Sequence, residues 1–344
     1  MYKIKQLPED FIVTEESTIK PAKQGKYAYF KLWKREYTTM RAVEHIADFL
    51  CIPQKDIGFA GAKDKEAITE QTISVRNGTS RLVETFKSDD IRLTFLGHGD
   101  TPISLGDLRG NRFRIVIRNL DHAPTKTDFI INYFDDQRFS TNNAAVGKAI
   151  LQGRFEEACR LIDEESVNAF LAEEPKNFIG ALHTISFRTL QFYLHAYQSL
   201  LFNQAVSEYL QCKYSSGELL DVTYTHGKLV FPLKRPENTS FPLIGFGVEY
   251  LDAVIEAIYQ RLLGQDSLTE RSFVVRAFPE LSEEGSTRDI VAEVQDLKLS
   301  ELEADDLNTG KKRCSVGFFL QKGSYATLVV KRMMVGLKPH PLRS

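Results

Sequence analysis

The stretch LGDLRGNRFRIVIR, residues 105–118, constrains the fold most, because its side chains alternate in character. One phase holds Phe113, Ile115 and Ile117, and the other holds Arg112, Arg114, Val116 and Arg118. Successive side chains of a β-strand point to opposite faces of a sheet. The pattern therefore predicts a strand that packs on a core with one face and presents arginines, suited to phosphate groups, on the other. An ordinary solvated strand face is the competing interpretation.

Further strand-like segments lie toward both ends of the chain. They are short runs rich in β-branched and aromatic residues: KYAYFKLWK, TEQTISV and IRLTFL in the first hundred residues, then RDIVAEVQDLKL and KKRCSVGFFLQKGSYATLVVKRMM after Pro279. The segment MRAVEHIADFL has helical spacing instead. Thr39 is its expected N-cap, and Pro53 lies beyond its end.

The middle of the chain differs in character. Acidic segments with helical spacing begin at about residue 154 and read FEEACRLIDEES, LQFYLHAYQSLLFNQAVSEYL and DAVIEAIYQRLL. Residues 141–281 hold 12 basic and 17 acidic side chains, a balance of −5, whereas the two flanking parts are mildly basic. We therefore expect an α+β body formed by residues 1–153 and 282–344, interrupted by an inserted α/β domain at 154–281. A mildly basic body suits a polyanionic partner.

Composition narrows the class of protein. The sequence has no run of 18 uncharged apolar residues, so no membrane span is expected, and MYKIKQLPEDF lacks the apolar core of a signal peptide. Its cysteines, which are Cys51, Cys159, Cys212 and Cys314, form no CxxC pair. This spacing favours reduced thiols in the cytoplasm and argues against a structural zinc site. GFGVEY at 245–250 does not complete a dinucleotide fingerprint, and no other motif predicts a cofactor.

Residues 58–71, GFAGAKDKEAITEQ, are a candidate catalytic stretch. Small residues surround Asp64, so that a ligand could approach the backbone closely. Lys63 and Lys65 flank the aspartate, and each favours its ionised form and could also meet a phosphate group. An ionised carboxylate can serve as a general base, a nucleophile or a metal ligand. A solvent-exposed Lys-Asp-Lys turn is the alternative.

Two further stretches could form a binding pocket. NYFDDQRFS, residues 132–140, combines aromatic rings with amides, as a pocket needs to stack a base and read its polar edge. A loop that fills the edge of a core with Tyr133, Phe134 and Phe139 is the competing interpretation, and the stretch taken alone favours it. LQKGSYATLVVKR, residues 320–332, reads as a Lys-Gly-Ser turn that opens a strand carrying Tyr325.

Taken in order, these segments resemble the TruD-type pseudouridine synthases, the tRNA pseudouridine-13 synthase family. The resemblance covers most of the chain and rests on PEDFIVTE, GFAGAKDKEAITEQ, LGDLRGNRFRIVIR, NYFDDQRFS, AYQSLLFN and LQKGSYATLVV. Its most specific element is the GxKDxxAxTxQ pattern. The resemblance implies the pseudouridine-synthase fold, a mixed and mainly antiparallel sheet with flanking helices, interrupted by the characteristic inserted TRUD domain.

The resemblance also implies roles for individual residues. The catalytic aspartate of the family falls on Asp64, and its pocket positions fall on Phe11, Asn132, Phe134 and Tyr325. The loop after Asn132 departs from the family pattern. Asp135 and Ser140 stand where glycines are common, and Ile131 stands where a proline is frequent.

The implied reaction is the isomerisation of a uridine in tRNA, at position 13 in this family. No redox change and no net hydrolysis occur, so neither a cofactor nor a metal is predicted. The base has to leave its stack to be reached, and we expect phosphate contacts from Arg112, Arg114 and Lys63 to offset that cost. The predicted partner is tRNA in the cytoplasm, with no membrane and no obligatory protein partner.

Two other classes stay open. A non-catalytic RNA-binding protein could use the same basic strand face. A metal-dependent hydrolase could use Asp56, Asp64 and Glu66 as ligands, because hard cations take oxygen ligands.

Overall fold

The computed structural model describes residues 1–78, 80, 85–140 and 142–335. Within these residues the chain divides into two compact units, the first comprising 1–128 and 293–326 and the second 129–292 and 327–335. The predicted domains have other boundaries, at 153/154 and 281/282. Residues 129–153 fall in the second unit because β7 (Phe129–Ile131) pairs with β12 (Val291–Glu293) and α3 (Asn143–Leu151) packs on α7 (Phe187–Lys213).

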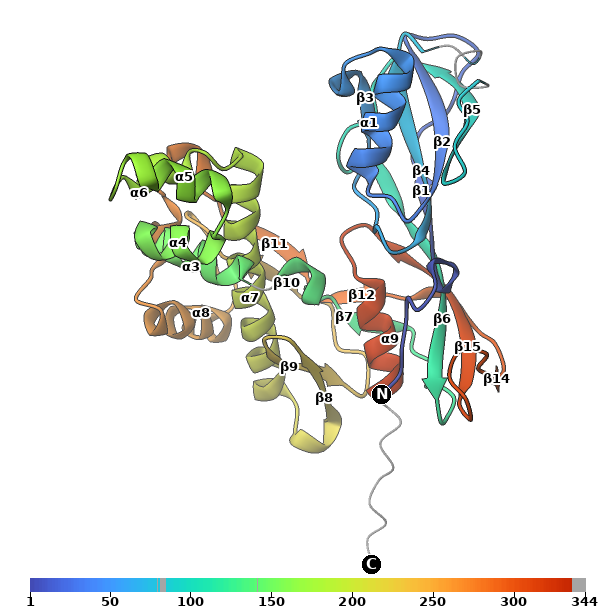
Figure 1. Cartoon of the computed structure of the whole chain (residues 1–344). Coiled ribbons are helices and arrows are strands. Elements are labelled where there is room, and N and C mark those ends of the chain that lie inside the picture. Colours follow the sequence, from blue (N-terminus) through green and yellow to red (C-terminus); the bar gives the residue numbers. More distant parts are fainter. Residues whose placement is uncertain (79, 81–84, 141, 336–344) are drawn as a thin grey trace, which may run out of the picture. The chain divides into compact units, whose positions relative to one another are not determined.

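The first unit is built on one sheet, which counts nine strands within the described residues (Figure 1). The strand order is β13-β15-β6-β1-β4-β2-β5, with β14 beside β15 and β3 beside β4. The strands are β1 (Phe11–Ser17), β2 (Tyr27–Arg35), β3 (Ile57–Phe59), β4 (Ile68–Arg76), β5 (Ile91–Gly99), β6 (Leu108–Leu120), β13 (Gln295–Leu299), β14 (Glu303–Ala304) and β15 (Lys312–Gln321). β1 and β4 are parallel and the other pairs antiparallel. The prediction of a mixed, mainly antiparallel sheet is confirmed.

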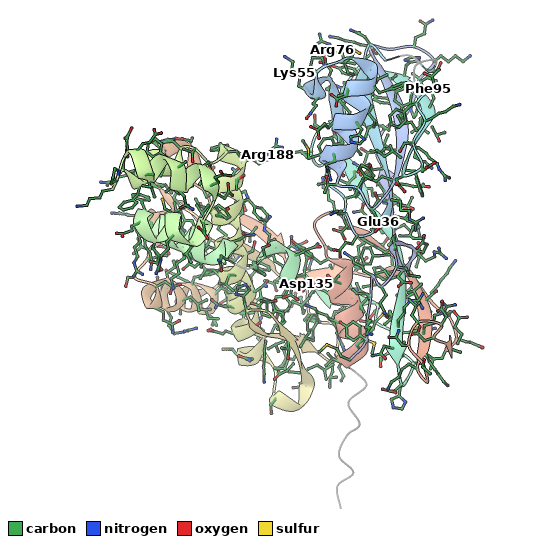
Figure 2. All side chains as sticks on the ribbon, viewed as in Figure 1. Glu36, Lys55, Arg76, Phe95, Asp135 and Arg188 are labelled. Atoms are coloured by element: carbon green, nitrogen blue, oxygen red, sulfur yellow. The ribbon has the colours of Figure 1, made fainter. Side chains whose placement is uncertain are left out.

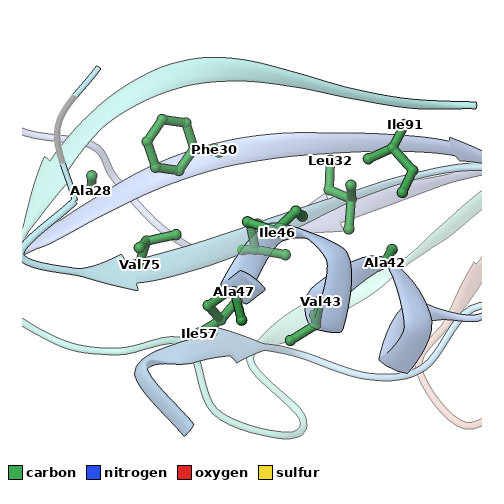
Figure 3. Packing of buried hydrophobic residues seen from close by; sticks show 11 residues of the cluster. Ala28, Phe30, Leu32, Ala42, Val43, Ile46, Ala47, Ile57, Val75 and Ile91 are labelled. Atoms are coloured by element: carbon green, nitrogen blue, oxygen red, sulfur yellow. The ribbon is translucent and has the colours of Figure 1, made fainter. Parts of the chain in front are cut away.

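Helix α1 (Thr39–Leu50) packs on this sheet with its apolar side (Figure 3). Its buried residues Ala42, Val43, Ile46 and Ala47 share one core cluster with the strand residues Ala28, Phe30, Leu32, Val75 and Ile91. The helix was predicted, but its N-cap is Thr38, whose side chain accepts a hydrogen bond from the backbone N of Arg41. Thr39 is already helical, which leaves its hydroxyl for another partner.

The strand register assigns side chains to two faces of the sheet. The inner face, which α1 covers, carries Phe11, Val13 and Glu15 of β1, Lys34 of β2, Gln71 of β4 and Phe113 of β6. The outer face carries the opposite phase, including Thr14 of β1 with Arg112 and Arg114 of β6. Phe113, Ile115 and Ile117 are buried, whereas Arg112 and Arg114 are exposed. The alternation predicted for this strand is therefore confirmed up to residue 117.

The second unit is mainly helical, with short strand pairs. Its long helix α7 contacts α3, α8, β9 and β10. The other helices are α4 (Phe155–Ile162), α5 (Glu165–Glu173), α6 (Phe178–Leu182), α8 (Ala253–Gln265) and α9 (Ala326–Val335), whose first residue belongs to the first unit. Besides β7–β12, the strand pairs are β8 (Leu219–Tyr224) with β9 (Gly227–Pro232) and β10 (Ser240–Leu243) with β11 (Ser286–Asp289). No helix within the described residues is both long and apolar enough to cross a membrane.

Two further expectations from the sequence are wrong. Tyr325 does not lie on a strand, because β15 ends at Gln321 and the next element is helix α9. The buried positions of α9 include 326, 329, 330 and 333, which have helical spacing. A short apolar run in the sequence does not by itself distinguish a helix from a buried strand. Arg118 is not part of an exposed basic face. Its side chain is buried and forms ion pairs with Asp10 and Asp305.

Candidate active site

The candidate catalytic loop, residues 60–66, connects β3 to β4. Its small residues leave space, since a Cβ atom built on Gly61 would meet no atom within 4 Å. The preceding Gly58 is required for a different reason. A Cβ atom there would lie 2.3 Å from the carbonyl oxygen of Ile103, so only glycine allows this close approach. The loop thus combines a tightly packed entry with an open middle.

Asp64 forms an ion pair with a residue distant in sequence. The Nζ atom of Lys5 lies 2.8 Å from Oδ2 of Asp64 and donates a hydrogen bond to it. The other carboxylate oxygen, Oδ1, accepts no hydrogen bond from the described part of the chain. The Asp64 side chain is 32% exposed. One oxygen is therefore held in place while the other can meet a ligand.

The two lysines that flank Asp64 in sequence have different surroundings. Lys63 turns its Nζ atom to Glu15 on the inner face, 2.5 Å from Oε2, and its side chain is buried. The other carboxylate oxygen of Glu15 accepts a hydrogen bond from the backbone N of Thr72. Lys65 is exposed. The ammonium group that contacts the Asp64 carboxylate is thus that of Lys5.

Phe11 supports Lys5. The Nζ atom of Lys5 lies 4.3 Å from the centroid of the Phe11 ring, close enough for a cation–π interaction. The ring is 2% exposed and contacts Phe113 edge to face at 6.2 Å. The predicted pocket residue Phe11 and the predicted catalytic residue Asp64 are therefore joined through Lys5.

Asn132 and Phe134 lie in the second unit. Asn132 is held on both sides of its amide, since Oδ1 accepts a hydrogen bond from Arg288 and Nδ2 donates one to the carbonyl oxygen of Asp289. The guanidinium group of Arg288 also stacks on Phe134, 4.3 Å from the ring centroid. Asn203 fixes the Phe134 backbone by accepting from its N and donating to its O.

The rest of this loop is fixed by charge. Asp135, labelled in Figure 2, accepts a hydrogen bond from Lys331 of α9 at 2.6 Å. Lys331 also pairs with Asp136. Hydrogen bonds to these carboxylates and attraction from them outweigh burial and raise the pKa of Lys331. Ser140 has a positive φ of 47°, a conformation that glycine adopts more readily.

The remaining predicted contacts lie elsewhere on the first unit. Tyr325 is half-buried and belongs to the short segment of chain that follows β15 and precedes α9. Arg112 and Arg114 lie on the outer face, and Asp64 belongs to a loop bound to inner-face residues, so the sheet separates them. Arg112 also forms ion pairs with Glu16 and Asp296, which raise its pKa.

Arg114 instead borders a hollow of about 340 Å³ on the outer face. Register places Gly317 between Arg114 and Lys298, which also lines the hollow. Neither cation forms an ion pair or a side-chain hydrogen bond with the described residues. The hollow therefore offers two available positive charges on either side of a glycine.

Another hollow, of about 780 Å³, belongs to the second unit. It lies at α4 and α6, and its lining includes Arg154, Phe155, Arg160, Lys176 and Phe178. No predicted site residue lines it. The described residues contain no group of three His, Cys, Asp or Glu side chains that could hold a metal ion. Asp56 instead lies beside Arg76, 3.7 Å from its Nη1 atom.

Sequence reasoning missed Lys5, Lys34 and Arg288. For Lys34 a signal existed, because in KYAYFKLWK this lysine falls in the same phase as Ala28, Phe30 and Leu32. A charged residue in the buried phase of a strand indicates a special role. Lys5 and Arg288 carry no such signal, since their partners depend on the folded chain.

Comparison with known proteins agrees with this architecture. The family model for tRNA pseudouridine synthase D (TruD) matches residues 2–168 and 159–333. Relatives that carry the same name include proteins from Methanosarcina acetivorans, 29% identical over 96% of this chain and 92% of the relative, and from Thermococcus gammatolerans, 32% identical over 96% and 94%. A crystal structure titled as this synthase from Methanosarcina mazei superposes with a TM-score of 0.71 at 26% identity, covering 96% of this chain and 93% of the other.

The sheet and the matched segments define an α+β isomerase of the pseudouridine synthase class. The chain belongs to the tRNA pseudouridine synthase D family.

Proposed function

We propose that this protein converts a uridine of tRNA, at position 13, into pseudouridine, with Asp64 as the catalytic residue. The observation that supports this most is the state of the Asp64 side chain. Lys5 holds one carboxylate oxygen at 2.8 Å, the other accepts no hydrogen bond within the described part of the chain, and the loop around it lacks bulky side chains. A fixed carboxylate with one open oxygen is suited to attack or to proton transfer.

The reaction is an isomerisation in which atoms and electrons balance. The bond from N1 of uracil to C1′ of the ribose breaks, the ring turns, and a bond from C5 to C1′ forms. C5 loses one proton and N1 gains one, so the proton count is unchanged. No oxidant or second substrate is consumed. Asp64 starts the reaction by acting on the sugar or on the ring, either by forming a covalent bond or by removing a proton. In both routes the nucleotide has to turn out of the RNA stack.

Lys5 is a positioning residue in this proposal. Its ammonium group fixes the orientation of the Asp64 carboxylate, and the Phe11 ring fixes the ammonium group. Reaction rates depend steeply on such alignment, and a misplacement of about 1 Å can cost roughly a hundredfold in rate. Phe11 thus belongs to the site through Lys5 as well as through its predicted contact with the substrate.

The other predicted substrate contacts come from Asn132, Phe134, Tyr325 and Lys63. Asn132 would read the polar edge of uracil only by exchanging its bonds to Arg288 or Asp289. Phe134 or Tyr325 would stack on the base. Contact between Lys63 and a phosphate group would require its ion pair with Glu15 to open.

We assign the RNA backbone contact of the outer face mainly to Arg114. Arg112 was predicted beside it, but Glu16 and Asp296 already balance its charge. Lys298 joins Arg114 across Gly317 and was not predicted. This contact serves RNA outside the target nucleotide, because the outer face is turned away from the Asp64 loop.

The proposed substrate, tRNA, also suggests the compartment of the protein and the role of its middle part. We place the protein in the cytoplasm with tRNA as its partner, and its four cysteines are free thiols, as expected there. We assign residues 154–281 as an inserted domain that grips a distant part of the RNA. No cofactor, metal or obligatory protein partner enters the proposal.

The test is to incubate the purified protein with bulk tRNA and to map new pseudouridines by carbodiimide labelling and reverse transcription. The expected result is one new site at position 13, formed equally with and without a chelator. Binding of tRNA without any product would support the non-catalytic binder instead. Activity lost on chelation would support a metal-dependent enzyme.

A further inference from the structure

Lys34 is a fully buried lysine beneath the catalytic loop. It lies on the inner face of β2, and its side chain is completely inaccessible to solvent. Burying an ammonium group is costly unless its donors are satisfied. A lysine at such a position therefore requires a specific set of acceptors.

The acceptors of Lys34 are backbone carbonyl oxygens. Its Nζ atom donates to Tyr37 O at 2.5 Å and to Asp64 O at 2.9 Å, with Lys63 O at 3.5 Å. An ammonium group has three donors, which matches three carbonyls. Two of these belong to the catalytic loop and one to the connection between β2 and α1. Lys34 therefore ties the peptide of Asp64 to the sheet.

The loop has further anchors, but those are neutral. Thr39 accepts a hydrogen bond from the backbone N of Lys63 and donates to Gln71, whose Nε2 donates to the carbonyl oxygen of Gly61. These hydrogen bonds do not change with pH in the physiological range. Lys34 differs from these anchors because it can lose a proton.

Charged groups face Lys34 from several elements. The loop contributes Asp64, which attracts its charge, and Lys63, which repels it. Each of these two residues has an ion-pair partner of its own: Lys5 pairs with Asp64, and Glu15 of β1 pairs with Lys63. Burial lowers the pKa of Lys34 to about 8, with attraction to Asp64 raising it and repulsion from Lys63 lowering it further.

We propose that Lys34 is a positioning residue whose ammonium form holds the Asp64 loop in its reactive geometry. This inference rests on the proposed function. Loss of the proton leaves a neutral amine with two donors for three carbonyls, so the peptide of Asp64 is no longer held by a charge-assisted hydrogen bond. Turnover then falls while RNA binding, which uses other surfaces, is preserved.

The first test is the pH dependence of kcat at saturating tRNA between pH 6.5 and 9.5, in the wild type and in Lys34→Met. The wild type is expected to lose about tenfold of kcat per pH unit above a midpoint near 8, as for a single ionisation. Lys34→Met is expected to be roughly 10 to 100 times slower at pH 7, with KM unchanged and with this alkaline limb absent. An alkaline limb that persists in the variant would belong to another group, such as the uracil ring, and would overturn the proposal.

The matched control is Lys31→Met. Lys31 lies on the same strand but on the outer face, where it pairs with Glu70 at 3.5 Å. The same change of residue there is expected to leave kcat and its pH profile within twofold of the wild type. Equal effects of both variants would mean that charge in general, and not Lys34, sets the rate.

A second measurement needs no variant. Hydrogen exchange of the wild-type peptide 60–66, corrected for the intrinsic effect of pH, is expected to lose protection between pH 7 and pH 9, whereas the strand peptide 70–76 keeps it. Unchanged protection of the loop would overturn the proposal even if Lys34→Met fails to fold. Absence of pseudouridine at every pH would instead contradict the proposed function, and the exchange experiment would still decide the role of Lys34.

Discussion

The Nζ atom of Lys5 lies 2.8 Å from Oδ2 of Asp64, across 59 residues of sequence. The neighbouring Lys63, by contrast, directs its ammonium group to Glu15. The carboxylate is therefore paired by the chain segment that leads into β1 and not by its own loop. This arrangement couples the position of the N-terminal segment to the geometry of the candidate catalytic group.

The first prediction concerns the carboxylate itself. Asp64→Asn keeps the shape of the side chain but removes its charge and its capacity to act as base or nucleophile. We expect product formation to be abolished in single-turnover assays, while the Kd for tRNA stays within about tenfold, or roughly 1.4 kcal/mol. Substantial turnover by the pure variant would remove Asp64 from the mechanism.

The second prediction concerns Lys5. In Lys5→Met the carboxylate loses its ion pair, and we expect kcat to fall roughly 10 to 100-fold with a smaller effect on tRNA binding. Lys5→Arg should recover part of the rate because it restores the charge. The control is Lys3→Met, two residues earlier, where the exposed lysine contacts Asn308. If Lys5→Met and Lys3→Met have equal rates, the ion pair has no role in turnover.

The third prediction concerns the outer face. The double variant Arg114→Ala, Lys298→Ala should weaken tRNA binding and reduce the slope of log K against log salt by about 1 to 2, because each phosphate contact contributes roughly 0.7 to 0.9. The control Lys228→Ala, Lys311→Ala removes the same charge from residues paired with Asp221 and Asp121. If the double variant and the control have the same slope, the RNA does not contact Arg114 and Lys298.

The fourth prediction concerns the buried ion cluster of the first unit. Arg118 pairs with Asp10 and Asp305, both inaccessible to solvent, so Arg118→Met leaves two buried carboxylates without their partner. We expect the free energy of unfolding at pH 7 to fall by about 3 to 5 kcal/mol in urea denaturation. Arg154→Met, which breaks an exposed pair with Glu157, should cost less than about 1 kcal/mol. Equal losses of unfolding free energy in the two variants would mean that the buried ion pairs of Arg118 stabilise the fold no more than an exposed pair does.

The same cluster sets a dependence on pH. Burial opposes the charge of Asp305, but hydrogen bonds from the backbone of Asn119 and Leu307 and from Asn308 and Arg118 outweigh it and lower its pKa. A carboxyl group with a lowered pKa stabilises the fold above the pKa of the unfolded chain, about 3.9, and this stabilisation is lost as pH falls. The decline in unfolding free energy below pH 5 should therefore be shallower in Asp305→Asn.

Local pattern was sufficient for several features of this protein. The alternation of Phe113, Ile115 and Ile117 with Arg112 and Arg114 predicted both faces of β6, because the strand period of two depends on the backbone alone. The helix at 39–50 and the loop around Asp64 followed from spacing and from glycine. The same rule failed at Arg118, because alternation cannot reveal that this arginine forms ion pairs with the buried carboxylates of Asp10 and Asp305.

The sequence by itself determined most of the helices and strands, the family and the candidacy of Asp64. Only the tertiary structure decided which cation meets that carboxylate, that Lys34 lies beneath its peptide and that Arg114 lies on the opposite face from it. These relationships depend on strand register between segments tens of residues apart, such as β1 beside β4 and β2 beside β4. Register is selected by the simultaneous burial of many side chains, so no short stretch of the sequence carries it.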